Sequence, residues 1–153
     1  MDVLTPDAVG SVFAAALIEV VSRSLGLSLA VISGEKDSGL GEITGAMSLI
    51  GNRGGVVFIS AKESDMKTVY SCMLGVPSDE AAEEDIHDAM CEIVNMTAGS
   101  AKAMLGGTDF AFSLSQPFII CGDNMSVICK KRSSVFSTAL TDGEITIKIK
   151  IIF

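Results

Sequence analysis

Residues 86–104, IHDAMCEIVNMTAGSAKAM, have the apolar spacing of an amphipathic helix, and this helix decides how the rest of the chain is arranged. At about 100° per residue, one side of the helix carries a stripe of apolar and small side chains. We expect this stripe to be buried: Ile86, Met90, Ile93, Thr97, Ser100 and Met104. A helix with one apolar side needs a second layer to pack against, which the strand-like segments around it would supply.

The opposite side of the same helix carries polar residues that a simple solvated face does not need. Five positions lie within roughly 80° of one another on this side. They are Asp88, Glu92, Asn95, Gly99 and Lys102. Asn is a mediocre helix former, and Gly in a helix interior costs about 1 kcal/mol relative to Ala. Such exceptions on an exposed face are typical of functional sites. From periodicity alone, a solvated face without function remains the alternative.

Turn and cap signals on either side of this helix divide the chain into two further helices and several strands. One helix begins with Thr5 as N-cap and Pro6 in its first turn, and ends near Gly26. Another begins at Ser60, whose spacing to Glu63 fits a capping box. It ends at Gly75. We expect the central helix to begin at Ser78 and to end near residues 106–107. Strands are predicted at 27–33, 42–50, 55–60, 115–121, 125–130, 134–140 and 144–153.

These elements predict one α+β domain over residues 1–153, with an antiparallel sheet packed against the long central helix and two shorter helices. The short connection between 42–50 and 55–60 favours antiparallel pairing. The last segment, EITIKIKIIF, alternates strictly, so Lys148 and Lys150 are expected to face water. This long strand is predicted to be a sheet edge that needs protection.

Composition excludes several classes of function. The chain of 153 residues has a net charge of −8, which provides no general attraction to nucleic acid or to anionic membranes. The apolar run over residues 9–21 is shorter than the roughly 20 residues that span a bilayer, so no membrane insertion is expected. The four cysteines show no CxxC spacing and His87 is the single histidine, so we expect no metal site. Free, buried thiols and a cytoplasmic location are the simplest interpretation.

The pattern Glu92-x-x-Asn95-x-x-x-Gly99-x-x-Lys102 resembles the signature of the CheC/CheX chemotaxis phosphatases. The resemblance extends over most of the chain, with an N-terminal helix, the segments GEITGAMSLIG and GGVVFISA, a helix ending in MLG, the motif helix and terminal strands in the same order. CheC proteins carry two such motifs. The first helix has Glu19 and Gly26 at matching positions but Ser22 in place of Asn, so the chain is most similar to CheX.

The resemblance implies that the protein dephosphorylates the aspartyl phosphate of a CheY-like receiver domain. Glu92 then matches the acidic residue that pairs with the receiver's lysine, and Asn95 matches the amide that orients the attacking water. Gly99 and Lys102 match a small and a basic position on the same face, and Asp88 lies beside them as a further binding residue. The protein would need no cofactor of its own, because the receiver supplies Mg²⁺.

The resemblance also implies a homodimer. A non-catalytic module that binds receivers or flagellar-switch components through the same helix is the main alternative, since the wider family includes switch proteins. A generic oligomeric α+β domain, with Gly99 in a helix-packing surface, is a third.

Overall fold

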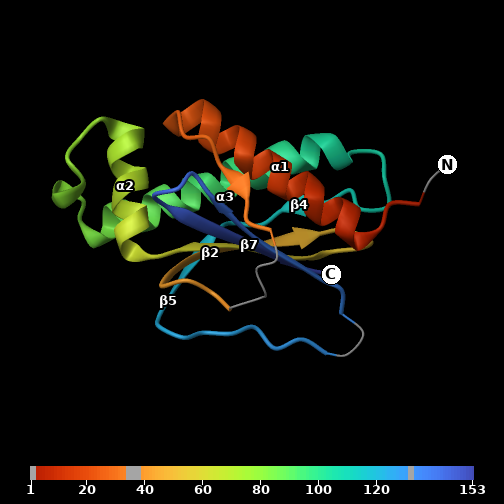
Figure 1. Ribbon diagram of the computed structural model, residues 1–153. Coiled ribbons are helices and arrows are strands. Elements are labelled where there is room, and N and C mark those ends of the chain that lie inside the picture. The colour runs from red at the N-terminus through yellow and green to blue at the C-terminus, as the bar shows by residue number, and fades with distance from the viewer. Residues whose placement is uncertain (1–2, 34–38, 131–132) are drawn as a thin grey trace.

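The helices lie together on one side of an antiparallel sheet in the computed structural model, which describes residues 3–33, 39–130 and 133–153 (Figure 1). The helices are α1 (Pro6–Leu25), α2 (Glu63–Leu74) and α3 (Glu83–Leu105), with a 3₁₀ turn at Ser78–Glu80. The strands are β1 (Ala30–Val31), β2 (Ile43–Ile50), β3 (Gly55–Ala61), β4 (Ser113–Leu114), β5 (Phe118–Cys121), β6 (Val135–Thr141) and β7 (Thr146–Ile152). The sheet order is β1-β6-β7-β3-β2-β4, and β5 also pairs with β2. The predicted α+β class is confirmed.

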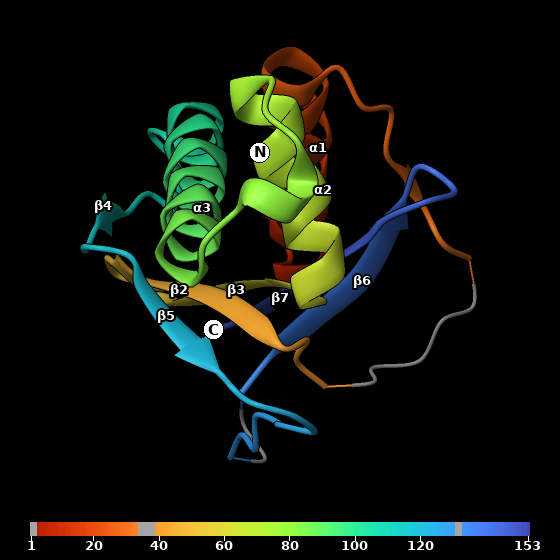
Figure 2. The same ribbon diagram turned by 90° about the vertical axis from the view of Figure 1, so that its left-hand side faces the viewer.

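The core lies between the sheet and the helices, and α3 crosses it close to β2 (Figure 2). The first four residues of the predicted stripe, Ile86 to Thr97, are buried. The last two predictions are wrong, because Ser100 is half-buried and Met104 is 49% exposed, whereas Ala101 and Leu105 are buried instead. The reason is that α3 packs against α1 and α2 as well as the sheet, so towards its C-terminal end the buried side is turned around the helix from Ser100 and Met104 to Ala101 and Leu105.

A glycine in β2 allows α3 to lie this close to the sheet. A Cβ atom at Gly45 would be 2.5 Å from Val94 Cγ2 and 2.9 Å from Met90 Cγ, both on α3. At distances this short, a side chain at position 45 would require the Val94 and Met90 side chains, or the helix that carries them, to move. Gly45 therefore sets the position of the helix that carries the polar face.

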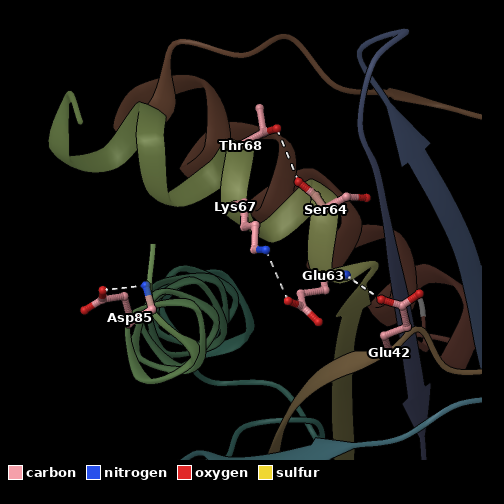
Figure 3. A network of polar contacts seen from close by, with 7 residues as sticks. Glu42, Glu63, Ser64, Lys67, Thr68 and Asp85 are labelled. Carbon is pink, nitrogen blue, oxygen red and sulfur yellow. Dashed lines mark hydrogen bonds and ion pairs between the residues drawn. The ribbon is translucent and has the colours of Figure 1, made fainter. Parts of the chain in front are cut away.

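Local signals correctly predict the ends of α1 but not the start of α2. Thr5 Oγ accepts the Ala8 N–H at 3.2 Å, and Gly26 ends α1 with φ of 69°. Ser60, the predicted cap of α2, instead lies in β3, where its Oγ accepts the Gly41 N–H at 2.9 Å. The helix begins at Glu63, whose N–H donates to Glu42 Oε2 at 2.9 Å, as Figure 3 shows.

The predicted start of α3 at Ser78 is also wrong. Ser78 begins the 3₁₀ turn, and α3 itself begins at Glu83 after the N-cap residue Ala82. Asp85 Oδ2 accepts the Ala82 N–H at 2.9 Å, which is the half of a capping box that an alanine N-cap allows (Figure 3). The carboxylates of three acidic residues in this first turn, Glu83 to Asp85, interact favourably with the positive end of the helix dipole.

The strand predictions fail where pairing depends on distant segments. The segment predicted at 27–33 forms only the two-residue β1, and residues 125–130 form no strand. The final strand β7 is not an edge, because it pairs with β3 on one side and β6 on the other. Lys150 is accordingly 5% exposed and Lys148 is half-buried, so neither lysine is simply solvated.

The first helix meets the length and composition of a membrane span. Helix α1 has 20 residues with a mean hydropathy of 1.6, and no other helix within the described ranges reaches these values. The apolar run counted in the sequence was shorter than the helix that contains it. In this fold α1 has buried residues along its length, including Phe13, Leu17 and Val21, and packs against α3 as a core helix does.

Candidate functional site

The predicted polar residues lie together on the outward face of α3. Asp88, Glu92, Asn95 and Lys102 are exposed, and Gly99 is half-exposed. From the first to the last of these residues the face extends about 21 Å along the helix. Within the described part of the chain, no hydrogen bond or ion pair engages any of these side chains. They are therefore available to a partner.

Three of these five residues also line a groove, and the other two do not. Asp88, Glu92 and Asn95 form one wall of a groove of about 480 Å³. Its remaining lining comes from Cys91 and from the connection between β4 and β5, at Ser115, Gln116 and Pro117. In Figure 2, α3 lies directly beside β4 and β5. Gly99 and Lys102 lie farther along the same face of α3, outside the groove.

The second wall of the groove is a β-bulge that the sequence analysis missed. In β4, Leu114 pairs with Leu49, whereas in β5, Phe118 pairs with Ala46. Three residues, 115–117, therefore lie opposite the two residues 47–48 of β2. One extra residue in an edge strand defines a bulge, and bulges often direct a side chain at an active site. Pro117 within the predicted strand 115–121 was the available signal, because proline in sheets is confined to edges and bulges.

No contact with another described part of the chain requires glycine at position 99. Beyond its neighbours in sequence and the backbone of its own helix, a Cβ atom added there would meet no described atom within 4 Å, in contrast to Gly45. Gly99 lies inside α3 and not at its end, where glycine is common. The small residue therefore leaves space on the outer surface and does not serve packing within the chain.

The cysteines are free, as expected, but they are not buried. Cys72 and Cys121 are exposed, while Cys91 and Cys129 are half-buried. Burial in the groove and the nearby Asp88 carboxylate raise the pKa of the Cys91 thiol. The Cys91 side chain therefore stays protonated and uncharged at neutral pH, and adds no negative charge to the groove.

His87 lies near the start of α3, and the structure gives it a contact that the sequence analysis did not anticipate. Its Nε2 atom is 3.3 Å from Cys121 Sγ in β5. Although Cys121 is exposed as a residue, partial desolvation of its sulfur raises the pKa of the thiol, and the Glu83 and Glu63 carboxylates raise it further. No group of three His, Cys, Asp or Glu residues within the described ranges is arranged to hold a metal ion.

The site as built offers a carboxylate and a carboxamide side by side on a rigid helix. The Glu92 carboxylate can accept hydrogen bonds from a lysine ammonium group of a partner. The Asn95 amide can accept a hydrogen bond from water through its oxygen and can donate one to an oxygen of a phosphoryl group through its nitrogen. Such a face can position groups supplied by another molecule.

The family comparison is consistent with this arrangement. Residues 43–141, more than half of the chain, match the family model described as Chemotaxis phosphatase CheX. The matched range contains β2, α2, α3 and both walls of the groove. None of the curated protein sequences compared with the chain matches it.

Solved structures of the same family share the fold over nearly the whole chain. Chemotaxis protein CheX from Vibrio vulnificus is 24% identical, with a TM-score of 0.79, and the match covers 92% of this chain and 93% of that chain. A CheC-like superfamily protein from Shewanella sp. PV-4 is 21% identical, with a TM-score of 0.83 and coverage of 97% and 98%. CheX in the CheX-CheY-BeF3-Mg²⁺ complex from Borrelia burgdorferi is 20% identical, with a TM-score of 0.73 and coverage of 93% and 96%. The chain therefore belongs to the CheX family of chemotaxis phosphatases.

Proposed function

We propose that this protein hydrolyses the aspartyl phosphate of a CheY-like receiver domain and that α3 is the element that enters the receiver's active site. The observation that carries the proposal is the pair Glu92 and Asn95, exposed in one groove without partners among the described residues. Family membership supports the reaction, and the Borrelia burgdorferi complex of CheX with CheY, BeF3 and Mg²⁺ supports the class of partner.

Asn95 would position the attacking water. An aspartyl phosphate is already activated for hydrolysis, so catalysis requires mainly positioning and stabilisation of charge on the phosphoryl oxygens. The carboxamide oxygen of Asn95 accepts a hydrogen bond from water, and the group carries no charge that would repel the phosphoryl group. A carboxylate at the same position would repel it.

Glu92 would fix the orientation of the two proteins. It lies about one helical turn before Asn95, so its carboxylate can pair with the receiver's lysine while the amide enters the site. Asp88 adds a second negative charge on the same wall of the groove. Charge pairs at an interface mainly determine register and choice of partner. Lys102 and Gly99 lie farther along α3 and would contact the receiver outside the reacting centre.

The reaction would need no cofactor bound to this chain. The Mg²⁺ ion belongs to the receiver substrate, as the composition of the Borrelia burgdorferi complex suggests. Because the receiver is a cytoplasmic signalling domain, we also place this protein in the cytoplasm.

The test is the lifetime of a phosphorylated CheY-type receiver in Mg²⁺ with catalytic amounts of this protein. The wild type should shorten the lifetime. Asn95→Ala should abolish the effect, but this variant should still bind the receiver that carries beryllofluoride in place of the phosphoryl group, which we call the charged receiver. Asn95→Asp should also be inactive. Glu92→Ala should lose most of the binding.

Two results would overturn this proposal. If the wild type binds the charged receiver but leaves the lifetime of the phosphate unchanged, the protein is a non-catalytic receiver-binding or switch module. If Asn95→Ala retains full activity, the water is positioned by another residue and the assignment of this face is wrong.

A further inference from the structure

The bulge at residues 115–117 is held in one shape by contacts with β2. The Ser115 N–H donates to Ser48 O at 3.2 Å, and Ser115 Oγ accepts the Ser48 N–H at 2.9 Å. Pro117 fixes its own φ angle and has no N–H that would need a partner in the ladder. A segment with this many restraints holds the residue between Ser115 and Pro117 in a defined place.

That residue, Gln116, is exposed, and its side chain has no described hydrogen-bond partner. Its backbone carbonyl accepts a hydrogen bond from Ser115 Oγ at 3.3 Å, which adds to the restraints on the bulge. It lines the same groove as Asn95, Glu92 and Asp88, from the opposite wall. Its side chain is a carboxamide, with two N–H donors and one carbonyl acceptor. In this acidic groove it is uncharged, so it can lie near a phosphoryl group without repulsion.

We propose that Gln116 is a positioning residue that binds the main chain of the receiver next to the phosphoaspartate, an inference that rests on the proposed function. A carboxamide matches a peptide group, because it can donate to a carbonyl and accept from an N–H at the same time. The receiver is then held between two walls, α3 on one side and the bulge on the other. Gln116 does not touch the reacting atoms, so it affects affinity and leaves the chemical step to Asn95.

The experiment compares Gln116→Ala, Gln116→Glu and Asn95→Ala with the wild type. Two quantities are measured: steady-state hydrolysis of the phosphorylated receiver and the Kd for the receiver charged with beryllofluoride and Mg²⁺. In Gln116→Ala, loss of one or two hydrogen bonds should raise KM and Kd by about five- to tenfold, with kcat within about twofold of the wild type. Gln116→Glu should be weaker still, because it adds negative charge to the groove. Asn95→Ala should lose kcat.

Asn52→Ala is the matched control, since Asn52 is an exposed amide in the β2–β3 turn outside the groove. It should behave as wild type. Unchanged KM and Kd in Gln116→Ala, with Asn95→Ala inactive, would overturn the role of Gln116 and leave the proposed function intact. A loss of kcat alone in Gln116→Ala would also overturn it, since Gln116 would then act in the chemical step. A wild type that neither binds nor dephosphorylates receivers would overturn the proposed function and this inference together.

Discussion

At the scale of single residues, Gly99 is the position where function and stability are expected to oppose each other. A Cβ atom built there would meet nothing within 4 Å beyond its neighbours in sequence and the backbone of its own helix, and glycine is a poor residue for a helix interior. Gly99→Ala should therefore raise the free energy of unfolding by up to about 1 kcal/mol, as measured by urea denaturation. The same methyl group would occupy space left for the receiver, so its Kd for the charged receiver should rise.

Ser22→Ala is the matched control for this change. Ser22 is also exposed in a helix, at the position of α1 that parallels Asn95. The Ser22→Ala variant should have a slightly higher free energy of unfolding and an unchanged Kd for the charged receiver. If Gly99→Ala binds as tightly as the wild type, Gly99 has no role in docking.

Cys91 reports directly on occupation of the groove. Its thiol lines the groove, whereas Cys72 lies exposed on α2. Maleimide labelling, quantified at each cysteine by mass spectrometry, should slow at Cys91 when the charged receiver is added and stay constant at Cys72. Asp88→Asn should accelerate labelling of Cys91 in the free protein, because the Asp88 carboxylate contributes to the raised pKa of this thiol. Equal protection of both cysteines would indicate a different binding surface.

At the scale of elements, the contact between α3 and β2 determines where the functional face lies. Gly45→Ala should lower the free energy of unfolding by about 1–3 kcal/mol, because the new methyl group overlaps Val94 and Met90. Displacement of α3 should also reduce kcat. Gly106→Ala is the control, since its Cβ would meet its nearest neighbours at an ordinary 3.7 Å. Equal stability of the two variants would show that α3 is not held closely against β2.

The turn between β6 and β7 predicts a pH dependence of stability. Asp142 Oδ1 accepts the N–H groups of Ile145 and Glu144, each at 2.9 Å, and these bonds lower the pKa of the carboxyl below its ordinary 3.8. Because the folded pKa is the lower one, this contribution is complete above pH 3.8 and is lost as pH falls through the folded value. Asp142→Ala should cost about 1 kcal/mol at pH 7, and its difference from the wild type should narrow in acid. A difference that stays constant from pH 7 to pH 3 would contradict this.

Elements with local signals could be predicted from the sequence, and elements set by distant partners could not. Thr5 and Gly26 carry the information for the ends of α1 within a few residues. The start of α2 depends on Glu42, which lies 21 residues before Glu63 in sequence. The capping-box pattern at Ser60 was misleading because this residue is part of β3.

The same distinction applies to the site. The polar face of α3 follows from helical periodicity, so the exposure of Glu92 and Asn95 on one side of this helix could be predicted, whereas their proposed roles come from the family resemblance. The wall at residues 115–117 could not, because it depends on which strands pair with β2 and with what register. The wrong prediction of an edge for β7 has this cause too, since strand order is not encoded by alternation within a strand.

At the scale of the whole molecule, we predict a homodimer. This prediction rests on the family resemblance. The final strand gives no further reason for a dimer, because β7 is interior to the sheet. The open edges in the described structure are the two-residue β1 and the edge formed by β4 and β5. Sedimentation velocity at micromolar concentration should give twice the chain mass of 15.9 kDa. A mass of one chain across this range would refute the dimer.

The central position of β7 in the sheet has a consequence for folding during synthesis on the ribosome. This strand joins β6 on one side to β3 on the other, and it follows all the other described strands in the sequence. The β2–β3 hairpin and the helices can begin to associate during translation, but the two parts of the sheet cannot be joined until Thr146–Ile152 has emerged. A nascent chain that stalls before this point exposes apolar sheet surface and is a substrate for chaperones and proteases. Formation of the complete sheet therefore depends on a segment that is translated after all the other described strands.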